Sequence, residues 1–163
     1  MTALIGIWEC FENEEMESVL SELGTHQNLR EEAKFENGRV IIHFNENDVY
    51  LKQEFGKRFS EQTFPLNKEV DELTFDGRIV RSFLTLNSDR SLLQVQKHGF
   101  NETTITRTIS DNTLTSVIRT GEATGVMKFK RVGFPKHEDC FPTPPPKLDE
   151  NGQGGTQSVD RKL

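Results

Sequence analysis

One arginine falls where the strand pattern predicts the interior of the protein. Within residues 103–109, the odd positions Ile105, Arg107 and Ile109 share one strand face, and the even positions are all threonine. An unpaired buried charge is strongly unfavourable, so an inward arginine needs an anionic partner. That partner is either the head group of a bound ligand or an interior carboxylate, for which Glu72 is the candidate.

Other predicted strands also carry polar side chains on their apolar face. Alternation places several of them among inward leucine, valine and phenylalanine side chains: Gln62, Glu72, Arg78, Gln94 and Gln96. A dry core would not hold so many polar groups, whereas a cavity containing water would. We therefore predict an internal pocket, in which Gln94 and Gln96 organise water or contact the ligand, the first role being favoured.

The histidines and cysteines are not spaced for metal binding or nucleophilic catalysis. The sequence contains no HxxxH, HExxH, CxxC or GxSxG motif. Cys10 falls on an early strand, where a small buried side chain is expected rather than a nucleophile. We predict no catalytic residues, no metal site and no cofactor, and an enzyme is the least favoured class of protein.

The elements that must position these side chains are helices followed by many short strands. Residues 16–23 carry apolar side chains at helical spacing, and Gly24 follows as a stop signal. Residues 27–33 predict a second, more polar helix. After Arg39, regularly spaced turn residues divide the chain into short antiparallel strands. With an opening strand at about residues 5–11, we count ten strands. Because so long a meander must close or leave exposed edges, we predict an all-β, up-and-down barrel capped by a helix-turn-helix.

The composition changes near Val132. Five of the six prolines and a glycine-rich stretch follow this residue. We predict a barrel domain over residues 1–132 and a disordered Pro/Gly-rich tail over residues 133–163. Residues 142–147 fit a PxxPx(+) pattern that SH3-type domains bind as polyproline II, although such patterns arise readily by chance in proline-rich tails.

Charge and hydropathy narrow the range of partners and compartments. The net charge of −6 argues against nucleic acid or an anionic membrane as the main partner. No apolar run approaches the roughly 20 residues that cross a bilayer, and the N-terminus lacks the basic region of a secretory signal. Two cysteines in unlike contexts form no disulfide framework. We expect a cytoplasmic monomer without stable membrane insertion.

Several short motifs occur in the order and at the spacing of one family. Residues 6–9 (GIWE), residues 14–17 and Leu23-Gly24 resemble the opening signature of the intracellular lipid-binding proteins, which comprise the fatty-acid-binding and cellular retinoid-binding proteins. Further matches follow in order: residues 40–42, Glu61, Phe64, and residues 76–78, 95–97 and 102–107. The resemblance covers about residues 4–132. It implies a calycin-type, lipocalin-like barrel and a divergent member with a C-terminal extension.

The resemblance also implies a binding site. In fatty-acid-binding members, the ligand carboxylate is usually held by an arginine on the eighth strand and an Arg-x-Tyr pair on the tenth. Arg107 matches the first position, whereas the pair falls on Met127-Lys128-Phe129, which lacks both the second arginine and the tyrosine hydroxyl. The predicted ligand-binding residues are Arg107, Met127, Phe129, Arg78, Gln96, Glu72 and Gln62. Lys57 stands where many relatives have a phenylalanine at the cavity entrance.

Three functions follow from these observations. The leading prediction is reversible binding and carriage of a small hydrophobic ligand, a long-chain fatty acid with Arg107 as its anchor. The first alternative is carriage of an uncharged lipid such as a retinoid. The second is an interaction protein that acts through its proline-rich tail. In the competing interpretation of Arg107, its guanidinium forms a structural ion pair with Glu72 and has no ligand role.

Overall fold

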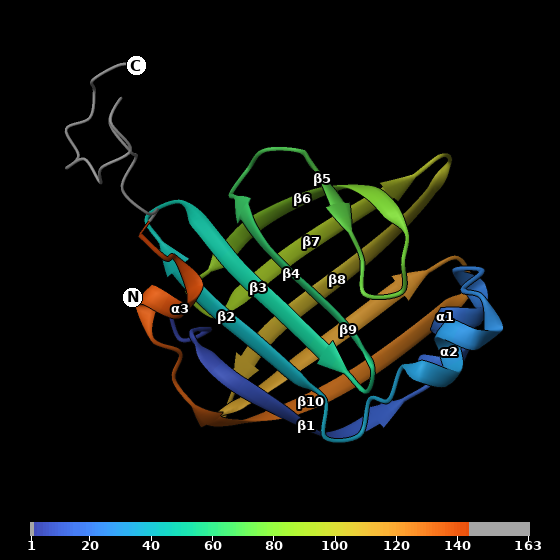
Figure 1. Ribbon diagram of the computed structural model, residues 1–163, viewed down its shortest axis with the longest axis horizontal. Helices are drawn as coiled ribbons and strands as arrows, with labels where there is room; N and C mark the ends of the chain where they lie inside the picture. The colour runs from blue at the N-terminus through green and yellow to red at the C-terminus, as the bar shows by residue number, and fades with distance from the viewer. Residues whose placement is uncertain (1, 144–163) are drawn as a thin grey trace, which may run out of the picture.

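The computed structural model describes residues 2–143, which form ten strands and three short helices (Figure 1). The strands are β1 (Gly6–Glu14), β2 (Arg39–Asn45), β3 (Asp48–Phe55), β4 (Arg58–Pro65), β5 (Val70–Leu73), β6 (Ile79–Ser88), β7 (Ser91–His98), β8 (Asn101–Ser110), β9 (Thr113–Thr120) and β10 (Ala123–Gly133). The helices are α1 (Met16–Glu22), α2 (Gln27–Glu32) and α3 (His137–Cys140). None of these helices is long and apolar enough to span a membrane.

The strands form one antiparallel sheet that is nearly closed into a barrel. Their order is β4-β3-β2-β1-β10-β9-β8-β7-β6-β5, so strands that follow one another in the sequence pair, apart from β4 and β5, and β10 pairs with β1. Within residues 2–143 no ladder joins the two edge strands, β4 and β5, but Gln62 Nε2 donates a hydrogen bond to the Asp71 carbonyl at 2.7 Å between them. The predicted ten-stranded up-and-down barrel is confirmed.

Turn chemistry accounts for the short connections. Between β8 and β9, Asp111 and Asn112 both have positive φ, 51° and 62°. Two consecutive positive φ values define a type I′ turn, whose twist matches that of the flanking strands and which Asn and Asp tolerate. The β3–β4 turn instead uses Gly56 at φ 66°.

Helix α1 covers one end of the barrel. Met16, Val19 and Leu20 are its buried residues, and their i, i+3, i+4 spacing turns one stripe toward the interior. Gly125 on β10 permits the close approach, because a Cβ there would lie 2.7 Å from Met16 Sδ. Both predicted helices are present, and α2 buries none of its residues, in keeping with its polar sequence.

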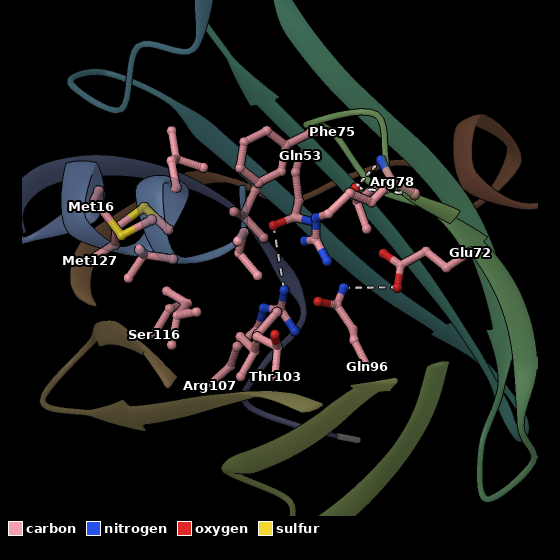
Figure 2. Close-up of a pocket in the computed structure, with 17 residues that line it drawn as sticks. Met16, Gln53, Glu72, Phe75, Arg78, Gln96, Thr103, Arg107, Ser116 and Met127 are labelled. Atoms are coloured by element: carbon pink, nitrogen blue, oxygen red, sulfur yellow. Dashed lines mark hydrogen bonds between the residues drawn. The ribbon is translucent and has the colours of Figure 1, made fainter. Parts of the chain in front are cut away.

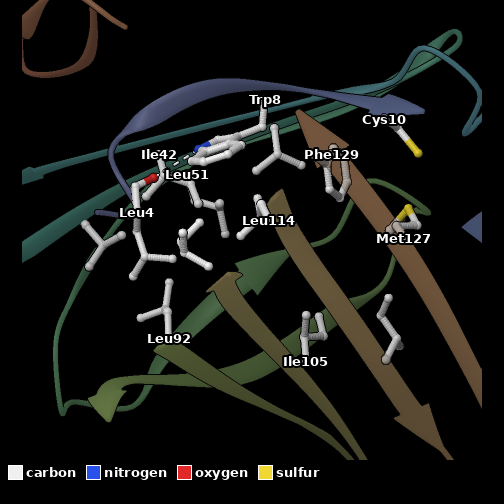
Figure 3. Packing of buried hydrophobic residues seen from close by; sticks show 14 of the residues in the cluster. Leu4, Trp8, Cys10, Ile42, Leu51, Leu92, Ile105, Leu114, Met127 and Phe129 are labelled. Carbon is white, nitrogen blue, oxygen red and sulfur yellow. Dashed lines mark hydrogen bonds between the residues drawn. The ribbon is translucent and has the colours of Figure 1, made fainter. Parts of the chain in front are cut away.

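An apolar core cluster packs inside the barrel (Figure 3). Trp8 on β1 is fully buried, and its indole Nε1 donates to the Leu4 carbonyl at 3.0 Å. The same cluster includes one side chain from each of β2, β3, β7, β9 and β10: Ile42, Leu51, Leu92, Leu114 and Phe129. Cys10 belongs to the same cluster, so its expected role as a small buried side chain is confirmed.

Ordered structure continues past the predicted boundary at Val132. Strand β10 extends to Gly133, and α3 packs against the outer wall of the barrel beside β2 and β3 (Figure 1). The Phe141 ring lies 5.9 Å from His43 and 6.2 Å from Tyr50, measured between ring centroids. The predicted disorder is therefore wrong for residues 133–143, because aromatic contacts stabilise this segment on the wall.

Cys140 is the last residue of α3, and its side chain is 5% exposed. Burial, assisted by the negative charges of Asp139 and Glu61, raises the pKa of its thiol to about 11. Because the thiolate is the reactive form, this cysteine is a packing residue. Residues 144–163, with most of the SH3-type motif, lie outside the described residues.

Candidate ligand-binding cavity

A cavity lies inside the barrel between α1 and the strands (Figure 2). Its free volume is about 40 Å³, which is enough for a small number of water molecules. Helix α1 contributes an apolar wall, and the strands contribute a mixed wall of apolar and polar side chains. The lining residues used below are Met16, Gln53, Glu72, Phe75, Arg78, Gln96, Arg107, Ser116 and Met127.

Arg107 is the central charged group of this cavity. Its side chain is 1% exposed, as the alternation within β8 predicted. Nη1 donates to Gln94 Oε1 at 2.8 Å and Nη2 donates to Gln53 Oε1 at 3.4 Å. Nε has no hydrogen-bond partner within residues 2–143. Burial lowers the pKa of Arg107 to about 10, against the opposing attraction of Glu72, so the guanidinium remains cationic at neutral pH.

Glu72 is the second buried charge, 3% exposed on β5. Its Oε1 accepts hydrogen bonds from Gln94 Nε2 at 2.9 Å and Gln96 Nε2 at 3.0 Å. Burial raises the pKa of Glu72, and the bonds from Gln96 and Ser82 and the charges of Arg107 and Arg78 oppose that rise.

The ion pair between Arg107 and Glu72 that the structural interpretation requires is not formed. Among the salt bridges within residues 2–143, none includes either residue. The carboxamide of Gln94 lies between them and contacts both. Arg107 is therefore stabilised by neutral amide oxygens and by a carboxylate that it does not touch.

Five of the seven predicted ligand-binding residues line the cavity, namely Glu72, Arg78, Gln96, Arg107 and Met127. Phe129 does not, because it is fully buried within the apolar core. Gln62 does not either, because its amide bridges the β4–β5 edge. Arg78 borders the cavity while its Nε donates to Asp76 Oδ2 at 2.8 Å, so its charge is already paired.

Other lining residues were not among the predicted site residues. Gln53 approaches Arg107 from β3, and Phe75 and Met16 border the same space. Gln53 shares the inward face of β3 with Val49, Leu51 and Phe55, so period-2 alternation could have identified it. Phe75 lies in a turn and follows no such period.

A buried hydrogen-bond network ties the helical cap to the barrel. Asp76, in the β5–β6 turn, accepts hydrogen bonds from Thr25 Oγ1 at 2.8 Å, Thr74 Oγ1 at 2.6 Å and Arg78 Nε at 2.8 Å. Burial alone would raise the pKa of Asp76, but the hydrogen bond and charge of Arg78, with the two threonine bonds, lower it. This carboxylate therefore connects the α1–α2 linker to the cavity rim.

Comparison with known proteins decides the family. No protein-family model matches the sequence. A fatty acid-binding protein of Clonorchis sinensis is 34% identical over 132 residues, which are 80% of this chain and 99% of the relative. The chain belongs to the fatty-acid-binding protein family. The resemblance inferred from short motifs is thereby confirmed.

Solved structures of fatty-acid-binding proteins share the fold. The Schistosoma mansoni fatty acid binding protein in complex with arachidonic acid is 26% identical, has a TM-score of 0.75, and covers 82% of this chain and 98% of its own. The Echinococcus granulosus fatty-acid-binding protein 1 is 21% identical with a TM-score of 0.72, covering 80% of this chain and 98% of its own. At that lower identity the second likeness supports the fold alone.

Proposed function

We propose that this chain binds and carries a long-chain fatty acid inside the barrel, with Arg107 as the anchor of the carboxylate. One observation carries the proposal. A buried guanidinium borders the cavity, touches no carboxylate within residues 2–143 and has an unpartnered Nε. An ionised head group would satisfy this group with charge-assisted hydrogen bonds.

Burial of the acyl chain supplies most of the binding free energy. At about 0.8 kcal/mol per buried CH₂, a 16-carbon chain gains roughly 10 kcal/mol before the costs of association and ordering. The apolar wall from α1, together with Ile105, Ile118 and Met127, offers the surface for this burial. Arg107 would then decide which head group is accepted.

Loading requires side chains to move. The free volume of about 40 Å³ is well below the roughly 300–1,000 Å³ of typical small-molecule sites. Met16 and Met127 line the cavity, and unbranched thioether side chains repack readily. Phe75 also lines the cavity and packs on Phe55 with ring centroids 5.0 Å apart, so its displacement would enlarge the free volume.

An uncharged lipid is the second candidate ligand, and a specific observation favours it. Gln53, Gln94 and Gln96 are all buried near Arg107, and carboxamides offer both donors and acceptors to a neutral head group. The acid and the matching alcohol therefore serve as the diagnostic ligand pair.

The proposal also covers catalysis, the cellular compartment and the oligomeric state. We propose a non-enzymatic carrier that acts as a cytoplasmic monomer, and the free thiols of Cys10 and Cys140 suit a reducing compartment. An SH3-type partner for residues 142–147 stays a sequence prediction.

The direct test is a titration of delipidated protein with palmitate and with hexadecanol, accompanied by native mass spectrometry. We expect one ligand per chain and tighter binding of the acid. Tighter binding of the alcohol would favour the neutral-lipid candidate. Absence of binding by either ligand would contradict lipid carriage.

A further inference from the structure

Gln94 occupies an unusual position between two buried charges of opposite sign. Its side chain is completely buried on β7. Oε1 accepts from Arg107 Nη1 at 2.8 Å, whereas Nε2 donates to Glu72 Oε1 at 2.9 Å and to Ser82 Oγ at 3.0 Å. One carboxamide therefore links the cation and the anion of the cavity.

The charges on either side fix the orientation of this amide. If the carboxamide were flipped, its NH₂ group would face the guanidinium, which is donor-only, and its carbonyl would face the Glu72 carboxylate, which accepts when ionised. Both contacts would be repulsive. Gln94 is thus locked with each polar atom matched to its neighbour.

The bridge has a consequence for ligand selection. A direct pair between Arg107 and Glu72 would occupy the guanidinium with a resident carboxylate, and an incoming fatty acid would have to displace it. With the amide between them, Arg107 keeps its positive charge and the unpartnered Nε. The cavity therefore retains an anion-binding group although it contains a carboxylate of its own.

We propose that Gln94 is a positioning residue for ligand selection, which keeps Arg107 and Glu72 from pairing directly and so leaves the guanidinium available to the ligand's ionised head group. This inference rests on the proposed fatty-acid-binding function.

Gln96 provides a matched control. It lies two residues further along β7 on the same inward face, is 5% exposed, and also donates to Glu72 Oε1, at 3.0 Å. Within residues 2–143 its side chain makes no hydrogen bond to Arg107. Gln94→Leu and Gln96→Leu therefore remove similar buried amides, but only Gln94→Leu removes the amide that hydrogen-bonds to both Arg107 and Glu72.

The experiment measures palmitate and hexadecanol affinities for wild type, Gln94→Leu, Gln96→Leu and the double variant Gln94→Leu/Glu72→Gln. We expect Gln94→Leu to weaken palmitate about tenfold or more, and to leave hexadecanol within about threefold, because one charge-assisted interaction is lost. Gln96→Leu should not reproduce the selective loss of palmitate, because it leaves the Gln94 bridge to Arg107 in place. The double variant should recover palmitate affinity, because the competing carboxylate is gone.

Two outcomes of the measurements on Gln94→Leu and the double variant overturn the inference. One is an equal loss for acid and alcohol in Gln94→Leu, and the other is a double variant that binds palmitate no better than Gln94→Leu. The single variant Glu72→Gln retains Gln94 and tests whether the Glu72 carboxylate competes with the ligand for Arg107. We expect its palmitate affinity to be equal to or higher than that of wild type, and a loss of about tenfold would also overturn the inference. A wild-type protein that binds neither ligand overturns the proposed function itself.

Discussion

Thr25 and Asp76 are 51 residues apart in the chain, yet the Thr25 hydroxyl donates to Asp76 Oδ2 at 2.8 Å in a buried environment. Thr25 lies in the linker between α1 and α2, and Asp76 lies in the β5–β6 turn. The bond therefore joins the helical cap to the part of the rim that carries Arg78 and Phe75.

Removing the carboxylate should destabilise the cap. Asp76→Asn is expected to lower the free energy of unfolding by about 1–3 kcal/mol at neutral pH, because buried hydrogen-bond donors lose a charged acceptor. Since the pKa of Asp76 is lowered in the folded state, its stabilisation is present above the ordinary Asp value of 3.8 and is lost as the pH falls below that value. Urea denaturation of both proteins between neutral and acidic pH should show the difference shrinking. A constant difference would contradict the prediction.

The same bond should control ligand exchange. Thr25→Val keeps the size of the side chain and removes the hydroxyl, so we expect faster release of fatty acid, measured by stopped-flow transfer. Thr124→Val, at an exposed position on β10, is the control. Equal release rates for wild type and both variants would show that the cap bond does not gate the cavity.

The anchor role of Arg107 predicts a selective loss. Arg107→Gln should weaken palmitate by about 1.5–3 kcal/mol, the usual value of a hydrogen bond to a charged group, and leave hexadecanol nearly unchanged. Because Arg107 pairs with no carboxylate within residues 2–143, the empty protein should keep its stability or gain some. Thermal melting of the delipidated variant, together with the two titrations, tests this. A large stability loss with equal effects on acid and alcohol would contradict the anchor role.

Met127 and Phe129 stand where many fatty-acid-binding proteins have an arginine and a tyrosine. Restoring these two residue types should have different effects at the two positions. Met127 borders the cavity, so Met127→Arg should add a second contact to the carboxylate and tighten palmitate binding. The empty variant should lose several kcal/mol, because the new cation is buried without a partner. Phe129→Tyr places a hydroxyl in the apolar core instead, so it should lower stability without improving affinity. Denaturation and palmitate titration of the two single variants check both statements.

Sequence patterns predicted the barrel and its charged interior because both follow from local alternation. The threonines at positions 104, 106 and 108 alternate with inward Ile105, Arg107 and Ile109, and this register fixes the arginine in the cavity. Alternation also placed Gln62 on an inward face, but β4 is an edge strand and its amide turns to the Asp71 carbonyl of β5 instead. A side-chain contact across the unpaired β4–β5 edge leaves no periodic signal in the sequence.

The remaining features depend on contacts between distant segments. The Gln94 bridge requires β5, β7 and β8 to be in register, and no single strand predicts it. Helix α3 has only four residues, too few for a helical period, and its stabilising contacts are with His43 and Tyr50 on the outer wall. A compositional change near Val132 could not reveal them.

Removing α3 should cost stability. A chain ending at Gly133 would expose Tyr50, which is 6% exposed beneath α3, and would lose the contacts of Phe141 and Cys140. We expect the free energy of unfolding to fall by about 1–3 kcal/mol, judged from the apolar area that is uncovered. Phe141→Ala should reproduce part of the loss, whereas Phe100→Ala, at a fully exposed turn position, should have no effect. Equal stability of the truncated and full-length chains would contradict the packing role of α3.

Acidification is expected to loosen α3 from the barrel wall. The rings of His43 and His137 lie 5.4 Å apart, and His43 Nδ1 is buried with no hydrogen-bond partner within residues 2–143. Burial, with the charge of His137, lowers the pKa of His43. Stability that depends on neutral His43 is therefore fully present above the ordinary histidine value of about 6.5 and is lost as the pH falls below it.

Hydrogen exchange of residues 137–141 at about pH 7.5 and about pH 5.5, corrected for intrinsic rates, measures this effect across the histidine range. We expect weaker protection at the lower pH, because a proton on His43 would be buried beside His137. Glu61 lies near enough to Tyr50 and Cys140 to raise the pKa of each, and its negative charge would offset part of the repulsion.

His43→Phe keeps an aromatic ring against Phe141 and removes the titrating group, so hydrogen exchange of residues 137–141 in this variant should not depend on pH. Strand β8, on a distant part of the barrel, serves as the internal reference. Equal protection of residues 137–141 at both pH values in wild type would show that His43 does not control the docking of α3.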